Sequence, residues 1–225
     1  MPSFDIVKKN EPAQTFRVSK IQADFDVKFE HSCERFTGNL QMPDDWQIGV
    51  IVGASGTGKS TIAKELFADQ IISGFEYNAK SVVDDMPKQC TIDEITKMFY
   101  SVGFGSVPSW LKPYAVLSNG EKMRVDLARA LLERDFVCFD EFTSVVDRQV
   151  AQTACIAISK AIKKSDKKFV AVTCHYDVLD WLQPDWVFDT NKMQCFFGTA
   201  HDRKSIMQSN GVNVESGRNL GVIII

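Results

Sequence analysis

The sequence predicts an α/β domain with a mixed, largely parallel sheet flanked by helices. Three apolar runs have the length and continuity of strands buried on both faces, at residues 47–52, 136–139 and 169–174. Segments with the helical spacing of apolar residues separate these runs, as expected where strands and helices alternate along the chain. With 225 residues, 44% of them hydrophobic, the chain is long enough for one such domain with a substantial core.

A glycine-rich turn joins the first apolar run to a helix predicted over residues 60–67. Its glycines allow main-chain amides to approach an anion, and the helix N-terminus adds positive potential. The charge of Lys59 suits the β- and γ-phosphates, and the Ser60 hydroxyl can bind Mg²⁺. A turn without a ligand is the weaker reading, because both the pattern and its flanks match a phosphate loop. The predicted nucleotide-binding residues are Gly53, Ala54, Ser55, Gly56, Thr57, Gly58, Lys59, Ser60 and Thr61.

Two carboxylates end the second apolar run, at the edge of the sheet where α/β folds bind ligands. Asp140 can hold Mg²⁺ through water. Glu141 can orient or deprotonate an attacking water molecule while negative charge moves onto the γ-phosphate. A glutamate at a strand end is often only solvated. Its position beside Asp140 and after a phosphate loop favours the catalytic role.

The peptide Leu117-Ser118-Asn119-Gly120-Glu121 lies between these two motifs. The spacing of Ser118 and Glu121 predicts a capping box at the start of an amphipathic helix, and an ordinary capped helix is the alternative reading. In this order the three motifs resemble those of the ABC-type ATPases, whose signature reads LSGGQ. Asn119 and Glu121 depart from that signature.

The resemblance implies a P-loop NTPase of ABC type, with ATP and Mg²⁺ as cofactors. It also implies an ATP-dependent homodimer, in which Ser118 and Gly120 contact the γ-phosphate held by the other copy. Asp147 matches a loop residue that acts across the dimer interface. His175 matches a switch histidine that contacts the γ-phosphate, although a lone histidine after a strand is usually structural.

Two elements of the family are harder to place. The family stacks adenine on an aromatic residue before the phosphate loop, for which Phe29 is preferred over Phe25 and Phe36. The preference is weak because residues 21–29 also fit a strand with alternating core positions. A glutamine that bridges Mg²⁺ and the helical insertion should follow a strand, here expected at residues 81–86; either Asp85 takes its place or Gln89 serves.

The expected organisation is an ATPase domain over residues 1–198 and an extension of unknown role over 199–225. Residues 1–12 are expected to be a loose polar start, and residues 14–46 to form an N-terminal antiparallel β subdomain. A short helical insertion is predicted at residues 90–116. The extension ends in four apolar residues, which could form an edge strand, begin a further domain or be loosely packed.

Composition excludes few functions. The net charge of −3 and the lack of a polybasic segment argue against a dedicated nucleic-acid groove, although a lysine cluster at residues 160–168 leaves nucleic-acid binding open. Cys138 and Cys174 are expected to be reduced core thiols. No apolar run is long enough for a membrane span or a signal peptide, which predicts a cytoplasmic protein without a membrane segment of its own.

These features predict a soluble ATPase that couples ATP hydrolysis to an unidentified partner, such as a fused or associated effector. The wording SNGEK, the compact insertion and the stretch DDWQIGVIVG resemble bacterial and phage soluble ABC-type ATPases, including those fused to a predicted acetyltransferase. Two alternatives stay open. The chain could be the nucleotide-binding subunit of a transporter, or a nucleotide-gated binding module that hydrolyses little.

Overall fold

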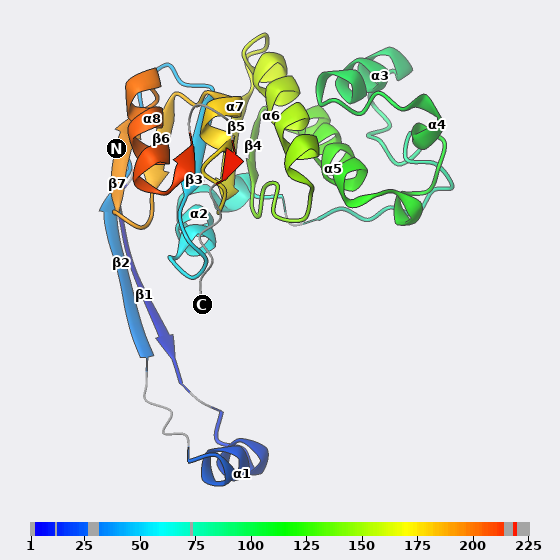
Figure 1. The fold of residues 1–225 in the computed structure, drawn as a ribbon. Helices are drawn as coiled ribbons and strands as arrows, with labels where there is room; N and C mark the ends of the chain where they lie inside the picture. Colours follow the sequence, from blue (N-terminus) through cyan, green and yellow to red (C-terminus); the bar gives the residue numbers. More distant parts are fainter. Residues whose placement is uncertain (1–2, 12, 27–31, 73, 214–217, 220–225) are drawn as a thin grey trace.

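A central sheet with helices on both faces forms the body of the molecule, as predicted (Figure 1). The computed structural model describes residues 3–11, 13–26, 32–72, 74–213 and 218–219. A helical lobe lies beside the sheet, and a two-stranded ribbon leads away from it.

The sheet has five strands in the order β4-β5-β3-β6-β7, and β7 is antiparallel to its neighbour whereas the other pairs are parallel. Because β3 lies in the middle, the segment after it has the ends of two other strands, β5 and β6, on either side. The strands are β3 (Ile48–Val52), β4 (Phe136–Phe139), β5 (Lys168–Thr173), β6 (Trp186–Asp189) and β7 (Gln194–Phe197).

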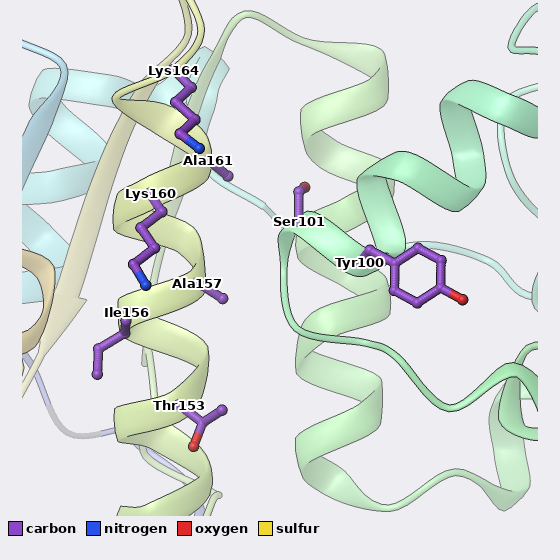
Figure 2. Close-up of a pocket in the computed structure, with 8 residues that line it drawn as sticks. All are labelled: Tyr100, Ser101, Thr153, Ile156, Ala157, Lys160, Ala161 and Lys164. Carbon is purple, nitrogen blue, oxygen red and sulfur yellow. The ribbon is translucent and has the colours of Figure 1, made fainter.

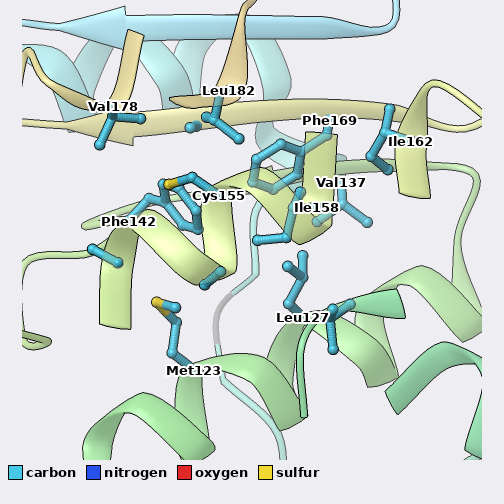
Figure 3. Close-up of a cluster of buried hydrophobic side chains, with 14 of the residues drawn as sticks. Met123, Leu127, Val137, Phe142, Cys155, Ile158, Ile162, Phe169, Val178 and Leu182 are labelled. Carbon is cyan, nitrogen blue, oxygen red and sulfur yellow. The ribbon is translucent and has the colours of Figure 1, made fainter. Parts of the chain in front are cut away.

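Two apolar layers bury the faces of this sheet. Alternate side chains of β3 point to opposite faces: Val50 joins a cluster with α5 and α6, whereas Ile51 joins a cluster with α2. Figure 3 shows the first cluster, in which Leu127 of α5 and Ile158 of α6 meet Phe169 of β5. The helices are α2 (Lys59–Phe67), the 3-10 turn η1 (Ala68–Gln70), α5 (Asn119–Glu133), α6 (Arg148–Ile162), α7 (Val178–Leu182) and α8 (Ala200–Ser209).

A glycine in β3 leaves room for a large side chain of the neighbouring strand β6. Gly49 pairs with Trp186 of β6, and a Cβ at Gly49 would lie 2.1 Å from the indole ring. The fully buried Trp186 fills that space and makes edge-to-face contact with Trp46, at a centroid distance of 5.4 Å. A larger residue than glycine at position 49 would therefore displace the indole.

The helical lobe has an aromatic core of its own. It contains α3 (Ile92–Ser101), α4 (Val107–Trp110) and the 3-10 turn η2 (Tyr114–Val116), within the segment where a helical insertion is expected. Trp110 lies 5.3 Å from the ring of Phe99, and its indole N–H donates to the carbonyl of Phe104 at 2.8 Å. A capping box between Thr91 and Glu94 begins α3.

A half-buried carboxylate ties this lobe to the segment after the phosphate-loop helix. The Tyr77 and Tyr114 rings stack at 3.9 Å, and their hydroxyls donate to the two carboxylate oxygens of Asp126 at 2.7 and 2.8 Å. Burial raises the pKa of Asp126, and the two hydroxyls oppose that shift. Asp126 belongs to α5, so the network holds this helix against two earlier segments of the chain, which contain Tyr77 and Tyr114.

The N-terminal ribbon corrects two sequence predictions. Residues 1–12 were expected to be loose, but β1 (Ser3–Asn10) pairs with β2 (Ser32–Asn39) in an unbroken antiparallel register. The predicted strand over residues 21–29 is wrong where the structure describes it, because α1 (Phe16–Asp24) begins at a Thr15 cap and includes residues 21–24. Figure 1 shows α1 at the far end of the ribbon, where its apolar residues pack against no core.

The C-terminal segment contains a helix that the sequence did not indicate. Ile206 and Met207 of α8 are each 1% exposed and join the main apolar cluster. A short pair, β8 (Val212–Asn213) with β9 (Arg218–Asn219), follows the helix. The apolar residues 220–225 lie outside the described part of the chain.

Cys138 is fully buried, as expected, and burial raises its thiol pKa to about 12. The prediction for Cys174 is wrong: β5 ends at Thr173, and Cys174 is exposed in the following loop. Within the described residues, none of the helices is both long and apolar enough to pass through a bilayer.

Candidate nucleotide site

The glycine-rich turn leads from the buried strand β3 directly into α2. Gly58 has a φ of +86° at the start of α2, a conformation that side chains with a Cβ rarely adopt. Lys59 is 8% exposed, and its ammonium group donates to the carbonyl of Ala54 at 2.7 Å. The lysine thus folds back over the turn that it follows.

The turn between β6 and β7 supports the phosphate loop from the side. The amide of Ala54 donates to the side-chain oxygen of Asn191 at 3.1 Å, and the hydroxyls of Thr57 and Thr190 lie 2.5 Å apart. A Cβ at Gly53 would lie 2.0 Å from the Thr190 hydroxyl, so glycine is needed there. Sequence reasoning missed Thr190 and Asn191, because only the strand order brings them to the loop.

The phosphate-loop helix and the strand β4 meet at the predicted metal ligands. The Ser60 hydroxyl donates to Oδ1 of Asp140 at 3.0 Å, and the amide of Glu141 donates to the same oxygen at 2.9 Å. A hydroxyl and a single carboxylate fit Mg²⁺, which proteins often bind with few ligands and complete with phosphate and water oxygens. In the described ranges, no group of three His, Cys, Asp or Glu side chains could hold a metal without such help.

Asp85 lies in a turn instead of at a strand end. Residues 81–86 form consecutive turns, so the strand predicted there is wrong. The Asp85 carboxylate accepts from the amides of Asn78 and Ala79, both at 3.0 Å. Neither Asp85 nor Gln89 is among the described residues that line the cavity at the phosphate loop.

A cavity of about 170 Å³ opens over the phosphate loop. The loop and α2 form one wall, Glu141 lies at another, and the ribbon contributes Lys8, Glu34 and Phe36. The structure therefore brings six of the nine predicted phosphate-binding residues and the predicted catalytic carboxylate to one cavity. Glu141 has a φ of 54°, in the left-handed region.

Among the described residues, Phe36 is the aromatic residue that lines this cavity. A Cβ at Gly58 would lie 2.6 Å from its ring, so the ring rests directly on the loop. Phe36 also lines a neighbouring cavity of about 430 Å³ with Arg35, Thr57 and Met193. Phe29, the preferred candidate for stacking adenine, lies outside the described residues, and Phe25 is 74% exposed at the end of α1.

Ser118 begins α5 through the predicted capping box. Its hydroxyl accepts from the Glu121 amide at 3.3 Å and donates to the Glu121 carboxylate at 2.9 Å. Ser118 is exposed, so this helix tip faces outward instead of into its own subunit. A Cβ at Gly120 would lie 2.8 Å from Val150, which places the tip beside the start of α6.

Asp147 and His175 lie on neighbouring loops. Asp147 is exposed and caps α6, because its side chain accepts from the Gln149 amide at 2.8 Å. His175 follows β5, and its Nδ1 lies 3.4 Å from the buried Thr143 hydroxyl. Burial lowers the pKa of His175, as does the nearby Arg148, and this shift favours the neutral imidazole.

A second cavity lies away from these residues, between α3 and α6. It has a volume of about 450 Å³. Figure 2 shows Ala157 and Ala161 of α6 facing Ser101 of α3, with Lys160 and Lys164 along α6. It shares no lining residue with the cavity at the phosphate loop.

Comparison with known proteins supports a nucleotide-binding fold. The family model of the NB-ARC domain matches residues 29–138, a segment that includes the phosphate loop and stops before Asp140. No curated protein sequence matches the chain.

Several solved structures of ABC cassettes are similar to it. The cassette MJ0796 in a post-hydrolysis state bound to ADP and Pi is 14% identical with a TM-score of 0.56, over 83% of this chain and 92% of that one. CbiO1 from Clostridium perfringens, part of the cbiONQ transporter complex, is 16% identical with a TM-score of 0.57, over 82% and 90%. A bacterial Atm1-family exporter with ATP bound is 17% identical with a TM-score of 0.53. There 73% of this chain matches, but only 35% of the exporter. The chain therefore has the P-loop NTPase fold of an ABC cassette, with an antiparallel N-terminal ribbon.

Proposed function

We propose that this chain is an ATPase whose complete site forms between two copies. The phosphate loop of one copy binds ATP, and the tip of α5 of the other copy closes the site. One observation carries the proposal: the cavity over the phosphate loop includes Glu141, while Ser118 is exposed on the outer edge of the same chain. A chain that completed its site alone would direct Ser118 toward its own loop.

The predicted residues of the phosphate loop, β4 and the loop after β5 each have a role in this scheme. Lys59 and the loop amides bind phosphate oxygens, and Ser60 with Asp140 would hold Mg²⁺, which when bound offsets phosphate charge. Glu141 accepts a proton from the attacking water molecule. His175, whose lowered pKa favours the neutral imidazole, can donate a hydrogen bond to the γ-phosphate. Phe36 replaces Phe29 as our candidate for contact with the base, because its ring rests on the loop.

The surface around the α5 tip supports a second copy as its partner. Leu111, Val116 and Val145 are 66%, 65% and 64% exposed. Val116 lies two residues before Ser118, and Val145 lies two residues before Asp147, so both flank residues assigned to the interface. Burial of such side chains in a dimer would add apolar stabilisation to the bridging nucleotide.

The decisive experiment uses Glu141→Gln, which should bind ATP but not release it by hydrolysis. Gel filtration or light scattering with ATP and Mg²⁺ should show a dimer, and the nucleotide-free variant should elute as a monomer. Adding Ser118→Arg to this variant should abolish the dimer while a fluorescent ATP analogue still binds. If Glu141→Gln stays monomeric at saturating ATP, the composite site is wrong.

Steady-state turnover separates an ATPase from a nucleotide-gated module. Wild type should hydrolyse ATP, and Lys59→Ala should not. Equal turnover of the two proteins, with ATP binding intact in wild type, would favour the module. A transporter subunit would instead be retained with a membrane permease, whereas a soluble effector, such as a fused acetyltransferase, would respond to ATP in the absence of membranes.

A further inference from the structure

The loop between β4 and α6 contains two residues in a strained conformation. Glu141 has a φ of 54°, and Thr143 has a φ of 65°. A β-branched residue is rarely found in this region, and it persists there only where its surroundings hold it in place. Thr143 is 1% exposed, so packing and hydrogen bonds within the chain must supply that support.

Part of this support comes from an arginine that reaches back from the first turn of α6. Arg148 donates from Nη1 to the Thr143 hydroxyl at 3.4 Å, and from Nε to Oδ2 of Asp177 at 3.0 Å. Its other terminal nitrogen contacts the second oxygen of Asp177, and the guanidinium lies 5.0 Å from the centre of the Trp181 ring. The Asp177 side chain is 5% exposed, whereas that of Arg148 is 32% exposed. The pair is bidentate and largely shielded, the kind of geometry in which an ion pair fixes orientation.

Arg148 therefore links Asp147, at the proposed interface between copies, with His175, at the proposed γ-phosphate position. It directly follows Asp147, which caps α6 and is proposed to face the other copy. The Thr143 hydroxyl that it contacts lies 3.4 Å from Nδ1 of His175, the proposed γ-phosphate contact. Asp177, its ion-pair partner, lies in the same loop as His175. If the start of α6 moved, Arg148 would move with it, and its contact with Thr143 beside His175 would change.

We propose that Arg148 is a positioning residue that couples the Asp147 loop to His175. When one copy binds another, Arg148 transmits the change through Thr143 and Asp177. The orientation of the His175 imidazole in the same chain therefore depends on dimer formation. This deepens the proposed function by assigning regulation of that site, and the coupling within one chain can be tested separately from hydrolysis.

A purely structural ion pair is the competing explanation. Removing Arg148 alone would leave the buried Asp177 without its partner and could prevent folding. The variants are therefore Arg148→Lys, Arg148→Met and the double variant Arg148→Met with Asp177→Asn, which removes both charges. Arg17→Met, which removes an exposed guanidinium from α1, is the matched control.

The first measurement is NMR of the histidine side chains in the nucleotide-free protein. The chain has three histidines, so the His175 signal is identified by its loss in His175→Gln. Arg148, Asp177 and Glu141 are the charged groups that act on His175. Arg148→Met should shift both the resonance and its titration midpoint, the latter upward because a nearby positive charge is lost. Arg148→Lys should stay closer to wild type. An unchanged His175 signal in folded Arg148→Met or in the double variant would overturn the coupling.

The second measurement is turnover. Arg148→Met and the double variant should lower kcat about tenfold with little change in KM, a size typical of coupling between sites. Arg148→Lys should recover part of the loss, and Arg17→Met should lose nothing. If all folded variants keep wild-type kcat, Arg148 has only a structural role. If wild type itself does not hydrolyse ATP, the proposed function fails, but the NMR result still decides the coupling.

Discussion

At the scale of single residues, side-chain environment decides which of the predicted groups can act. His175 is half-buried near Arg148, and Lys59 folds back on its own loop. Neither arrangement can be derived from the local sequence, because Arg148 is distant from His175 in the chain and the Lys59 contact depends on how its own loop folds. The residue types were predictable, but their charge states and contacts depend on the folded structure.

The lowered pKa of His175 predicts a pH dependence of stability. Near pH 6 the unfolded chain binds a proton at this imidazole more readily than the folded chain does. The free energy of unfolding should therefore fall as pH drops through the ordinary histidine pKa of about 6.5. His175→Gln should reduce this loss in urea titrations between pH 5 and 8. Cys174→Ser, a change at the exposed neighbour, should keep the wild-type slope. If the free energy of unfolding of His175→Gln depends on pH as steeply as that of wild type, His175 is not the group responsible.

Asn191 gives a prediction about nucleotide affinity. Its side chain holds the Ala54 amide at 3.1 Å, so Asn191→Ala should loosen the phosphate loop. One such hydrogen bond contributes about 1 kcal/mol, which corresponds to roughly fivefold weaker ATP binding. Titration with a fluorescent ATP analogue measures the effect. Asn210→Ala, at the end of α8, should bind like wild type, and equal affinity of Asn191→Ala would show that the turn does not support the loop.

At the scale of elements, the strands of the sheet and the helices around the motifs could be predicted, because long apolar runs and capping residues carry a local signal. The predicted strands near residues 47–52 and 136–139, and the helix after Ser118, are confirmed. The ribbon helix α1 was missed because a short alternating pattern also fits a helix. Residues 81–86 fold as turns because Asp85 accepts backbone amides from residues 78 and 79.

The candidate site divides in the same way. Motifs that act through the backbone, such as the phosphate loop and the capped α5, are local and were visible in the sequence. Phe36, Asn191 and Arg148 act through packing between elements that are far apart in the chain. The strand order that brings them to the site is fixed by long-range pairing, which no single segment encodes.

The Asp126 network makes a prediction for the element α5. Asp126→Ala would leave the half-buried hydroxyls of Tyr77 and Tyr114 without an acceptor, at a cost of about 2 kcal/mol in the free energy of unfolding. Tyr77→Phe should cost about 1 kcal/mol. The rate of amide hydrogen exchange should rise in the segments that contain Tyr77 and Tyr114. The exposed Asp166→Ala should be neutral, and an equally mild effect of Asp126→Ala would mean that the carboxylate does not fix the helix.

At the scale of the whole molecule, the C-terminal helix belongs to the core of the body. Ile206 is 1% exposed, so Ile206→Ala should cost about 2 to 5 kcal/mol in the free energy of unfolding. The neighbouring exposed Ser205→Ala should change it by less than about 0.5 kcal/mol. Chemical denaturation of both variants tests this. If Ile206→Ala is as stable as Ser205→Ala, α8 is a dispensable extension.

The central position of β3 has a consequence for refolding kinetics. Its partners are residues 169–173 and 186–189, so the strand that leads into the phosphate loop is fixed only after much of the chain has collapsed. Such non-local pairing slows folding of a domain. ATP can bind the phosphate loop only after the chain has passed the folding transition state. In stopped-flow experiments ATP should therefore leave the refolding rate unchanged and slow unfolding, and faster refolding with ATP would mean that the loop forms early.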